Sequence, residues 1–228
     1  MTILNIGTSV DRRPGPKYCA SLNFAEISFS GPPPKPATLK RWKSELPKQF
    51  SLSLVAPFGA IHSADGALLR DEALAEGAKW LVSSARALGA SFVVLPTSAH
   101  ITPGQRDRQR LQRVFDAVSS PKYTLYWQPS GLWEIPSAIH FTRDSDVQIA
   151  CDPLQPDVPP NSVGYARLRA IGGRSRFGEG VLYDLADRLS YLGKPVTQVA
   201  IQSEQSFREA RRLLEIATEA GLAGGEED

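Results

Sequence analysis

The chain carries eight short apolar segments, rich in β-branched and aromatic residues, spread from one end to the other. Most are followed by turn residues and then by apolar positions at helical spacing, which is typical of βα units. The predicted strands are Leu4–Thr8, Phe24–Phe29, Phe50–Pro57, Phe92–Pro96, Tyr123–Gln128, Val147–Cys151, Gly164–Leu168 and Val196–Gln202. Eight such units in 228 residues predict an α/β protein with a compact (β/α)8 TIM-type barrel.

The segments between the strands differ in how clearly their apolar pattern predicts a helix. The clearest helix is Asp71–Leu88, where apolar residues recur at steps of three or four before Gly89. Further helices are predicted over Lys17–Leu22, Ala37–Glu45, Pro103–Val118 and Gln205–Ala220. Residues 152–160, after the sixth strand, contain prolines too dense for a helix. The sixth outer helix is therefore predicted to be reduced or absent.

The strand-like segments continue without a polar linker, so we expect a single barrel domain over residues 1–220. Residues 221–228 are glycine-rich and acidic and are expected to form a flexible tail. Hydrophobic residues make up 42% and charged residues 22%, as in ordinary globular proteins. The net charge of +2 is too small to argue for nucleic acid by itself.

The cysteines and the lengths of the apolar segments indicate where in the cell the protein is expected. Cys19 and Cys151 form no C-x-x-C pair and are too few for a disulfide framework. The first residues lack the pattern of a signal peptide, and no apolar run reaches the roughly 20 residues that span a bilayer. We therefore expect a cytoplasmic protein with no membrane partner.

Several short motifs follow one another in a recognisable order. They are Gly7–Ser9, Ala25–Ile27, Thr38–Trp42, His62 after the third strand, Leu95–Pro96 and Tyr165–Leu168. In this order they resemble the G-T-S, V-E-I, T-L-x-R-W, loop His, L-P and Y-x-R-L motifs of the YecE-like family, domain of unknown function 72. The resemblance covers nearly the whole chain, and it implies the (β/α)8 fold of the known members.

The chain also departs from that family. The aromatic after the first strand is lost at Val10–Asp11, and Val55 and Val94 replace a lysine and a glutamine. The family's E-F-R-H and F-N-N-D motifs are replaced by Tyr126–Pro129 and Ala200–Ser203. The losses indicate a divergent member whose catalysis is altered or absent.

Glu26 is an acid inside an apolar strand, where a carboxylate is costly to bury unless it is paired. Arg167 in the seventh strand is its natural partner. Glu26 is a candidate for proton transfer, as is His62, whose imidazole titrates near neutral pH. The alternatives are a structural ion pair and a solvated loop histidine.

Anion binding is predicted at the ends of the first and seventh strands. The hydroxyls of Thr8 and Ser9 could hold an anion, or could only cap a turn. Arg167, Arg169 and Arg174 lie where this fold usually holds phosphate, and the guanidinium fork fits phosphate oxygens. The alternative is a solvated loop whose arginines pair with acids such as Glu179.

Two histidines and a carboxylate could also bind a metal, but neither His62 nor His100 stands in a metal-binding spacing, so no metal and no cofactor are expected. Cys151 has no visible base, so packing is its expected role.

The sequence therefore predicts a barrel that binds an anionic, phosphate-bearing small molecule or nucleic acid, with weak or no hydrolysis. The alternative is a non-catalytic barrel that serves as a scaffold for a protein partner.

Overall fold

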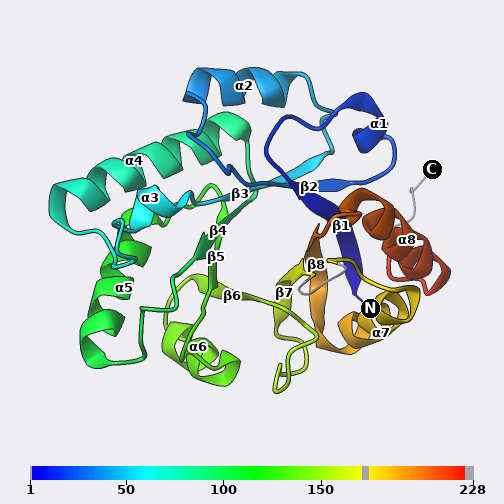
Figure 1. Ribbon diagram of the computed structural model, residues 1–228. Coiled ribbons are helices and arrows are strands. Elements are labelled where there is room, and N and C mark those ends of the chain that lie inside the picture. Colours follow the sequence, from blue (N-terminus) through cyan, green and yellow to red (C-terminus); the bar gives the residue numbers. More distant parts are fainter. Residues whose placement is uncertain (1, 171–174, 224–228) are drawn as a thin grey trace. The chain divides into compact units, whose positions relative to one another are not determined.

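The computed structural model describes residues 2–170 and 175–223 (Figure 1). Its strands are hydrogen-bonded in sequence order as a closed barrel, with β8 pairing in parallel with β1. The strands are β1 (Ile3–Val10), β2 (Phe24–Ile27), β3 (Ser51–Val55), β4 (Phe92–Pro96), β5 (Thr124–Gln128), β6 (Val147–Cys151), β7 (Val163–Arg169) and β8 (Gly193–Gln202). The predicted (β/α)8 fold is confirmed.

The helices follow the strands with one gap. They are α1 (Pro16–Cys19), α2 (Pro36–Ser44), α3 (Phe58–Ile61), α4 (Asp71–Leu88), α5 (Gln105–Val118), α6 (Ile135–Thr142), α7 (Glu179–Leu192) and α8 (Ser206–Glu219). Residues 152–162, between β6 and β7, form turns and extended chain, so the missing sixth outer helix is confirmed. The helices α3, α6 and α7 were not predicted. The first two have only four and eight residues and carry too little periodicity. The 14-residue α7 was missed although its buried Leu182, Leu185 and Leu189 recur at helical spacing.

The residue contacts divide the chain into two compact units. The first comprises Met1–Glu26, Pro47–Ser51 and Ala150–Asp228, and the second comprises Ile27–Leu46 and Leu52–Ile149. The single domain over residues 1–220 stays a prediction. Most of the predicted tail, residues 224–228, lies outside the described residues, but the carbonyl of Leu222 accepts the N–H of Leu4 at 2.7 Å.

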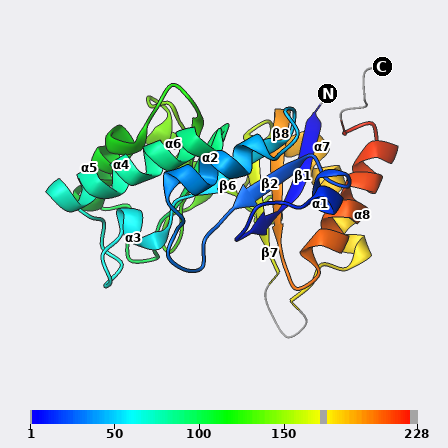
Figure 2. The same ribbon diagram turned by 90° about the horizontal axis from the view of Figure 1, so that it is seen from above.

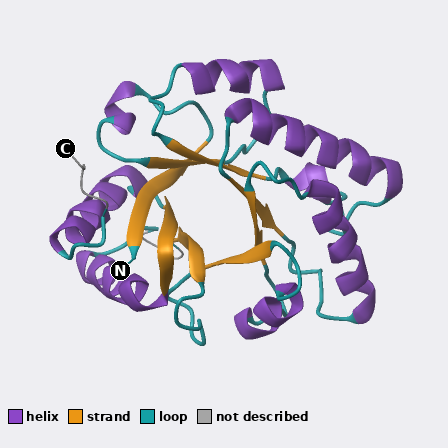
Figure 3. Cartoon of the chain, turned by 180° about the vertical axis from the view of Figure 1, so that it is seen from behind, coloured by secondary structure: helices purple, strands orange, loops and turns teal. Residues whose placement is uncertain are grey.

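In the first unit, α7 and α8 lie side by side outside the strands (Figures 2 and 3). The buried face of α8 includes Ala210, Leu213 and Ile216 at helical spacing, and the helix packs on β1 and β8. Every described residue of β2 is buried. A charged side chain on β2 must therefore find its partners inside the protein.

In the second unit, α4 packs against α2, α3 and α5 through its apolar stripe. Beneath α5 and α6 lies an aromatic cluster. The Trp127 ring meets Phe115 at 5.6 Å, Trp133 at 4.8 Å and Phe141 at 5.9 Å between centroids. The Nε1 of Trp127 donates to the Thr97 hydroxyl at 3.0 Å, so its polar end is satisfied.

Gly7 allows β1 to approach β2 closely. A Cβ at this position would lie 2.0 Å from the carbonyl oxygen of Phe24. Because this neighbour is backbone, it cannot rotate away. Gly7 belongs to the motif that precedes Thr8 and Ser9, and it therefore sets how the ends of β1 and β2 meet.

We predict that Gly7→Ala lowers the free energy of unfolding by about 2–3 kcal/mol, because the added methyl forces the two strands apart. Urea denaturation measures this change. Gly180→Ala in α7 is the matched control, since its Cβ would meet nothing within 4 Å. It should be neutral or stabilise by up to about 1 kcal/mol. Equal effects of the two substitutions would contradict the close approach at Gly7.

Candidate functional site

The carboxylate of Glu26 is the centre of the candidate site, and its residue is only 1% exposed. Arg167 holds it with two bonds, from Nε to Oε2 at 2.8 Å and from Nη2 to Oε1 at 2.9 Å. The hydroxyl of Ser9 donates to Oε1 at 2.9 Å, and that of Tyr165 donates to Oε2 at 2.9 Å. The predicted pairing of Glu26 with Arg167 is confirmed, and two hydroxyl donors complete the shell.

Strand alternation brings these groups together. Glu26 stands two residues after Phe24 on β2, and Arg167 stands two residues after Tyr165 on β7. The rings of Phe24 and Tyr165 meet edge to face, with centroids 5.9 Å apart. The ion pair thus sits one layer closer to the carboxyl ends of the strands than this aromatic pair, which is the end where barrel enzymes keep their active sites.

Arg167 is permanently charged in this setting. Burial alone would lower the pKa of Arg167, but the charge and hydrogen bonds of Glu26 raise it above its usual value. The side chain of Arg167 keeps 15% exposure, whereas that of Glu26 keeps 1%. Arg167 is thus the more exposed member of the pair.

Tyr18 is a second polar centre, which the sequence did not indicate. Its hydroxyl accepts the N–H of Thr8 at 2.8 Å, lies 3.1 Å from the Thr8 hydroxyl and donates to the carbonyl of Phe24 at 3.0 Å. Burial raises the pKa of Tyr18 to about 12, so it remains a neutral hydroxyl. The backbone N–H and hydroxyl of Thr8, predicted to hold an anion, are therefore engaged within the protein.

The predicted arginine cluster is only partly described. Arg169 is the last residue of β7 and is exposed. Arg174 lies outside the described residues. The alternative partner named for these arginines, Glu179, pairs instead with Arg212 of α8 at 2.6 Å.

Glu209 links the segments that follow β7 and β8, and it too went unnoticed in the sequence. It is 4% exposed, accepts the N–H of Phe177 at 2.8 Å and accepts the hydroxyl of Ser203. A lone acid in the first turn of a predicted helix gives no signal of such burial. Its donor at Phe177 lies 32 residues away, on a segment that only the fold places beside it.

His62 belongs to the second unit, so its surroundings are described separately from those of Glu26. Its imidazole is buried, stacks on Phe58 with centroids 4.6 Å apart and accepts the N–H of Ser98 on Nε2 at 3.2 Å. Burial lowers the pKa of His62, partly offset by the carbonyl of Phe58. The proton of the neutral ring is therefore on Nδ1, which has no hydrogen-bond partner of normal geometry among the described residues.

Among the described residues, His100 and Cys151 are not arranged for metal binding or nucleophilic catalysis. His100 is exposed, and within residues 2–170 and 175–223 no three His, Cys, Asp or Glu side chains gather closely enough to hold a metal ion. Cys151 ends β6 in a buried position, and burial raises its pKa to about 12, which disfavours the thiolate.

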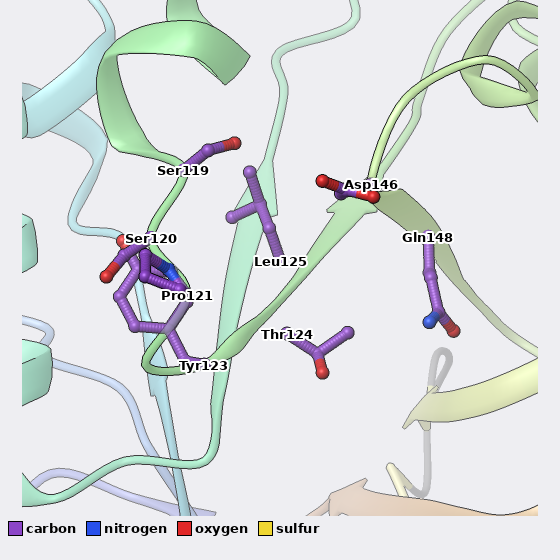
Figure 4. A pocket seen from close by; sticks show the side chains of 8 residues that line it. All are labelled: Ser119, Ser120, Pro121, Tyr123, Thr124, Leu125, Asp146 and Gln148. Atoms are coloured by element: carbon purple, nitrogen blue, oxygen red, sulfur yellow. The ribbon is translucent and has the colours of Figure 1, made fainter.

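A cavity of about 490 Å³ opens at the amino ends of β5 and β6 (Figure 4). Tyr123, Thr124, Asp146 and Gln148 are among the side chains that line it. In this fold the amino ends of the strands serve stability rather than chemistry. We therefore do not place the functional site there.

The sequence matches no family model and no curated protein. Among solved structures, a DUF72 family protein from Enterococcus faecalis is 12% identical, with a TM-score of 0.71 over 98% of this chain and 99% of that one. A DUF72 family protein from Thermotoga maritima is 14% identical, with a TM-score of 0.69 over 96% and 99%. Endonuclease IV from Thermus thermophilus is 13% identical, with a TM-score of 0.55 over 96% and 99%.

The structural neighbours of this chain thus include DUF72 family proteins along nearly its full length. At such low identities the likeness shows the fold alone. Separately, no helix of the described residues combines the length and apolar character that crossing a membrane requires.

We predict that Glu26→Gln lowers the free energy of unfolding by about 3–5 kcal/mol, because it leaves the guanidinium of Arg167 without its counter-charge. Chemical denaturation measures the loss. The double variant Glu26→Gln, Arg167→Met should recover much of it, since removing both charges leaves neither uncompensated. A single variant as stable as the parent would contradict the buried pair.

A second prediction concerns pH. Burial holds the pKa of His62 in the folded state below that of the unfolded chain, which binds a proton below about pH 6.5. The free energy of unfolding should therefore fall as pH drops through that value. In His62→Gln, which keeps an acceptor for the Ser98 N–H, this part of the loss should vanish. Urea denaturation of both proteins at about pH 8 and about pH 5 tests it, and equal losses in the two would contradict the buried neutral ring.

Proposed function

We propose that this protein is a divergent YecE-like barrel that binds an anionic, phosphate-bearing ligand at the carboxyl ends of its strands and hydrolyses it weakly or not at all. The ligand is a small molecule or a nucleic acid. The observation that carries the proposal is that Arg167, whose guanidinium is held by two bonds to Glu26, keeps 15% exposure of its side chain. A fixed guanidinium loses little freedom when it binds an anion.

Arg169 supports the proposal. It follows Arg167 by two residues on β7, so both side chains leave the strand on the same side. Its exposed position at the carboxyl end of β7 is where this fold commonly places phosphate. The proposed binding site therefore consists of Arg167, with Glu26 as its positioning residue, and Arg169.

The state of the acid and base candidates supports weak or absent hydrolysis. Glu26 accepts four hydrogen bonds from three side chains, so taking a proton from water would disrupt a complete shell. The Nε2 of His62 already accepts a backbone N–H. A general base needs a free lone pair within reach of its substrate.

A second candidate function is a scaffold for a protein partner. It is favoured by the engagement of Thr8 and Ser9 inside the protein, which leaves fewer polar groups for a ligand. It predicts that phosphate compounds do not bind at Arg169.

We predict that titration with inorganic phosphate, followed by 15N NMR, perturbs the amides of residues 167–170, and that binding weakens as salt rises. Arg169→Ala should weaken it about tenfold, because an arginine–phosphate contact is a charge-assisted pair. Arg143→Ala, an exposed charge in the other unit, is the control and should bind as the parent does.

A phosphomonoester assay completes this test, and turnover should stay at background. The proposal fails if phosphate leaves residues 167–170 unperturbed, or if Arg169→Ala and Arg143→Ala bind alike. Rapid turnover would refute the non-hydrolytic part alone.

A further inference from the structure

The first unit contains a second cationic surface, separate from Arg167 and Arg169. A groove of about 710 Å³ is lined by residues of α1, α7 and α8, and Figures 1 and 2 show α8 next to each of the other two helices. Arg176 to Glu179 line one side of it, α8 lines the other, and Lys17 of α1 also contributes. We call this surface the α7–α8 groove. Its volume falls within the range of about 300–1,000 Å³ that is usual for small-molecule sites.

Arginines dominate the α8 side of the groove. Arg208, Arg211 and Arg212 are spaced three and four residues apart, so they share one face of the helix. Arg212 is committed to Glu179 at 2.6 Å and to Glu215 at 3.3 Å. Arg211 lies 3.9 Å from Glu215.

The acids of the groove are all engaged. Glu179 and Glu215 face these arginines, and Glu209 is buried and accepts the N–H of Phe177 and the Ser203 hydroxyl. Lys17, Arg176 and Arg208 are exposed, and within residues 2–170 and 175–223 none of the three forms an ion pair. Three cations in one concave surface attract an anion more strongly than scattered charges do.

The groove also has an apolar part. Phe177 is half-buried at the start of α7, and Phe207 packs on Tyr18 with ring centroids 5.7 Å apart. Leu182 of α7 adds aliphatic surface. Apolar and aromatic walls with a few placed charges are typical of sites for organic ligands rather than for bare ions.

We propose that the α7–α8 groove binds an organic phosphate of nucleotide size. Arg176, Arg208 and Lys17 hold the phosphate, and the body of the ligand lies against Phe177. This site is independent of the one proposed at Arg169, because it uses none of the same side chains.

The experiment titrates AMP, adenosine and inorganic phosphate into the full chain, with calorimetry for affinity and 15N NMR for location. AMP should perturb the amides of residues 176–178 and 208 and should bind more tightly than either fragment. Arg176→Ala, Arg208→Ala should weaken AMP binding tenfold or more. The matched control is Arg86→Ala, Arg143→Ala, which removes two exposed charges from the other unit and should leave affinity unchanged.

The two proposals can be refuted independently of each other. Arg169→Ala should leave AMP binding at residues 176–178 intact, and the groove variant should leave the phosphate response at residues 167–170 intact. Should the alanine pair fold poorly by circular dichroism, Arg176→Gln, Arg208→Gln replaces it with the same expectation. Equal AMP affinity in the groove variant and its control overturns the groove proposal, as does equal binding of AMP and adenosine or the absence of AMP binding.

Discussion

A carboxylate buried in an apolar strand constrains everything around it in the first unit. At 1% exposure, the carboxylate of Glu26 receives four hydrogen bonds from Arg167, Tyr165 and Ser9, which offset the cost of burying it. These donors come from β1 and β7, while the acid is on β2. One charge therefore ties three strands together at their carboxyl ends. Loss of any donor would leave part of a buried charge unsatisfied.

The same constraint shapes the chemistry that the site can perform. A carboxylate with a complete set of donors is a good anchor and a poor base. The Tyr18 hydroxyl likewise engages Thr8. It accepts the backbone N–H of Thr8 and lies within hydrogen-bond distance of the Thr8 hydroxyl. The polar groups at the end of β1 are thus engaged within the protein, which leaves the exposed Arg169 and the α7–α8 groove as the proposed ligand sites.

Most of the fold could be predicted from the sequence, because apolar residues recur with a regular period along most helices and strands. Asp71–Leu88 is helical over its predicted bounds, and the prolines after β6 exclude a helix as expected. The four-residue α3 and the eight-residue α6 are too short to show such a pattern, and the 14-residue α7 was missed although it has one. Of the site, the pairing of Glu26 with Arg167 was predictable, because a buried acid in a strand requires a cation.

The barrel, the absent sixth helix and the identity of the charged pair could be read from the residues alone, since local periodicity and the cost of a lone buried charge are properties of the chain. Which polar groups are already engaged depends on the tertiary structure. Tyr165 reaches Glu26, and Glu209 reaches the N–H of Phe177, across separations of 139 and 32 residues. No local pattern encodes such contacts, because they arise only when the strands close into a sheet and bring distant residues together.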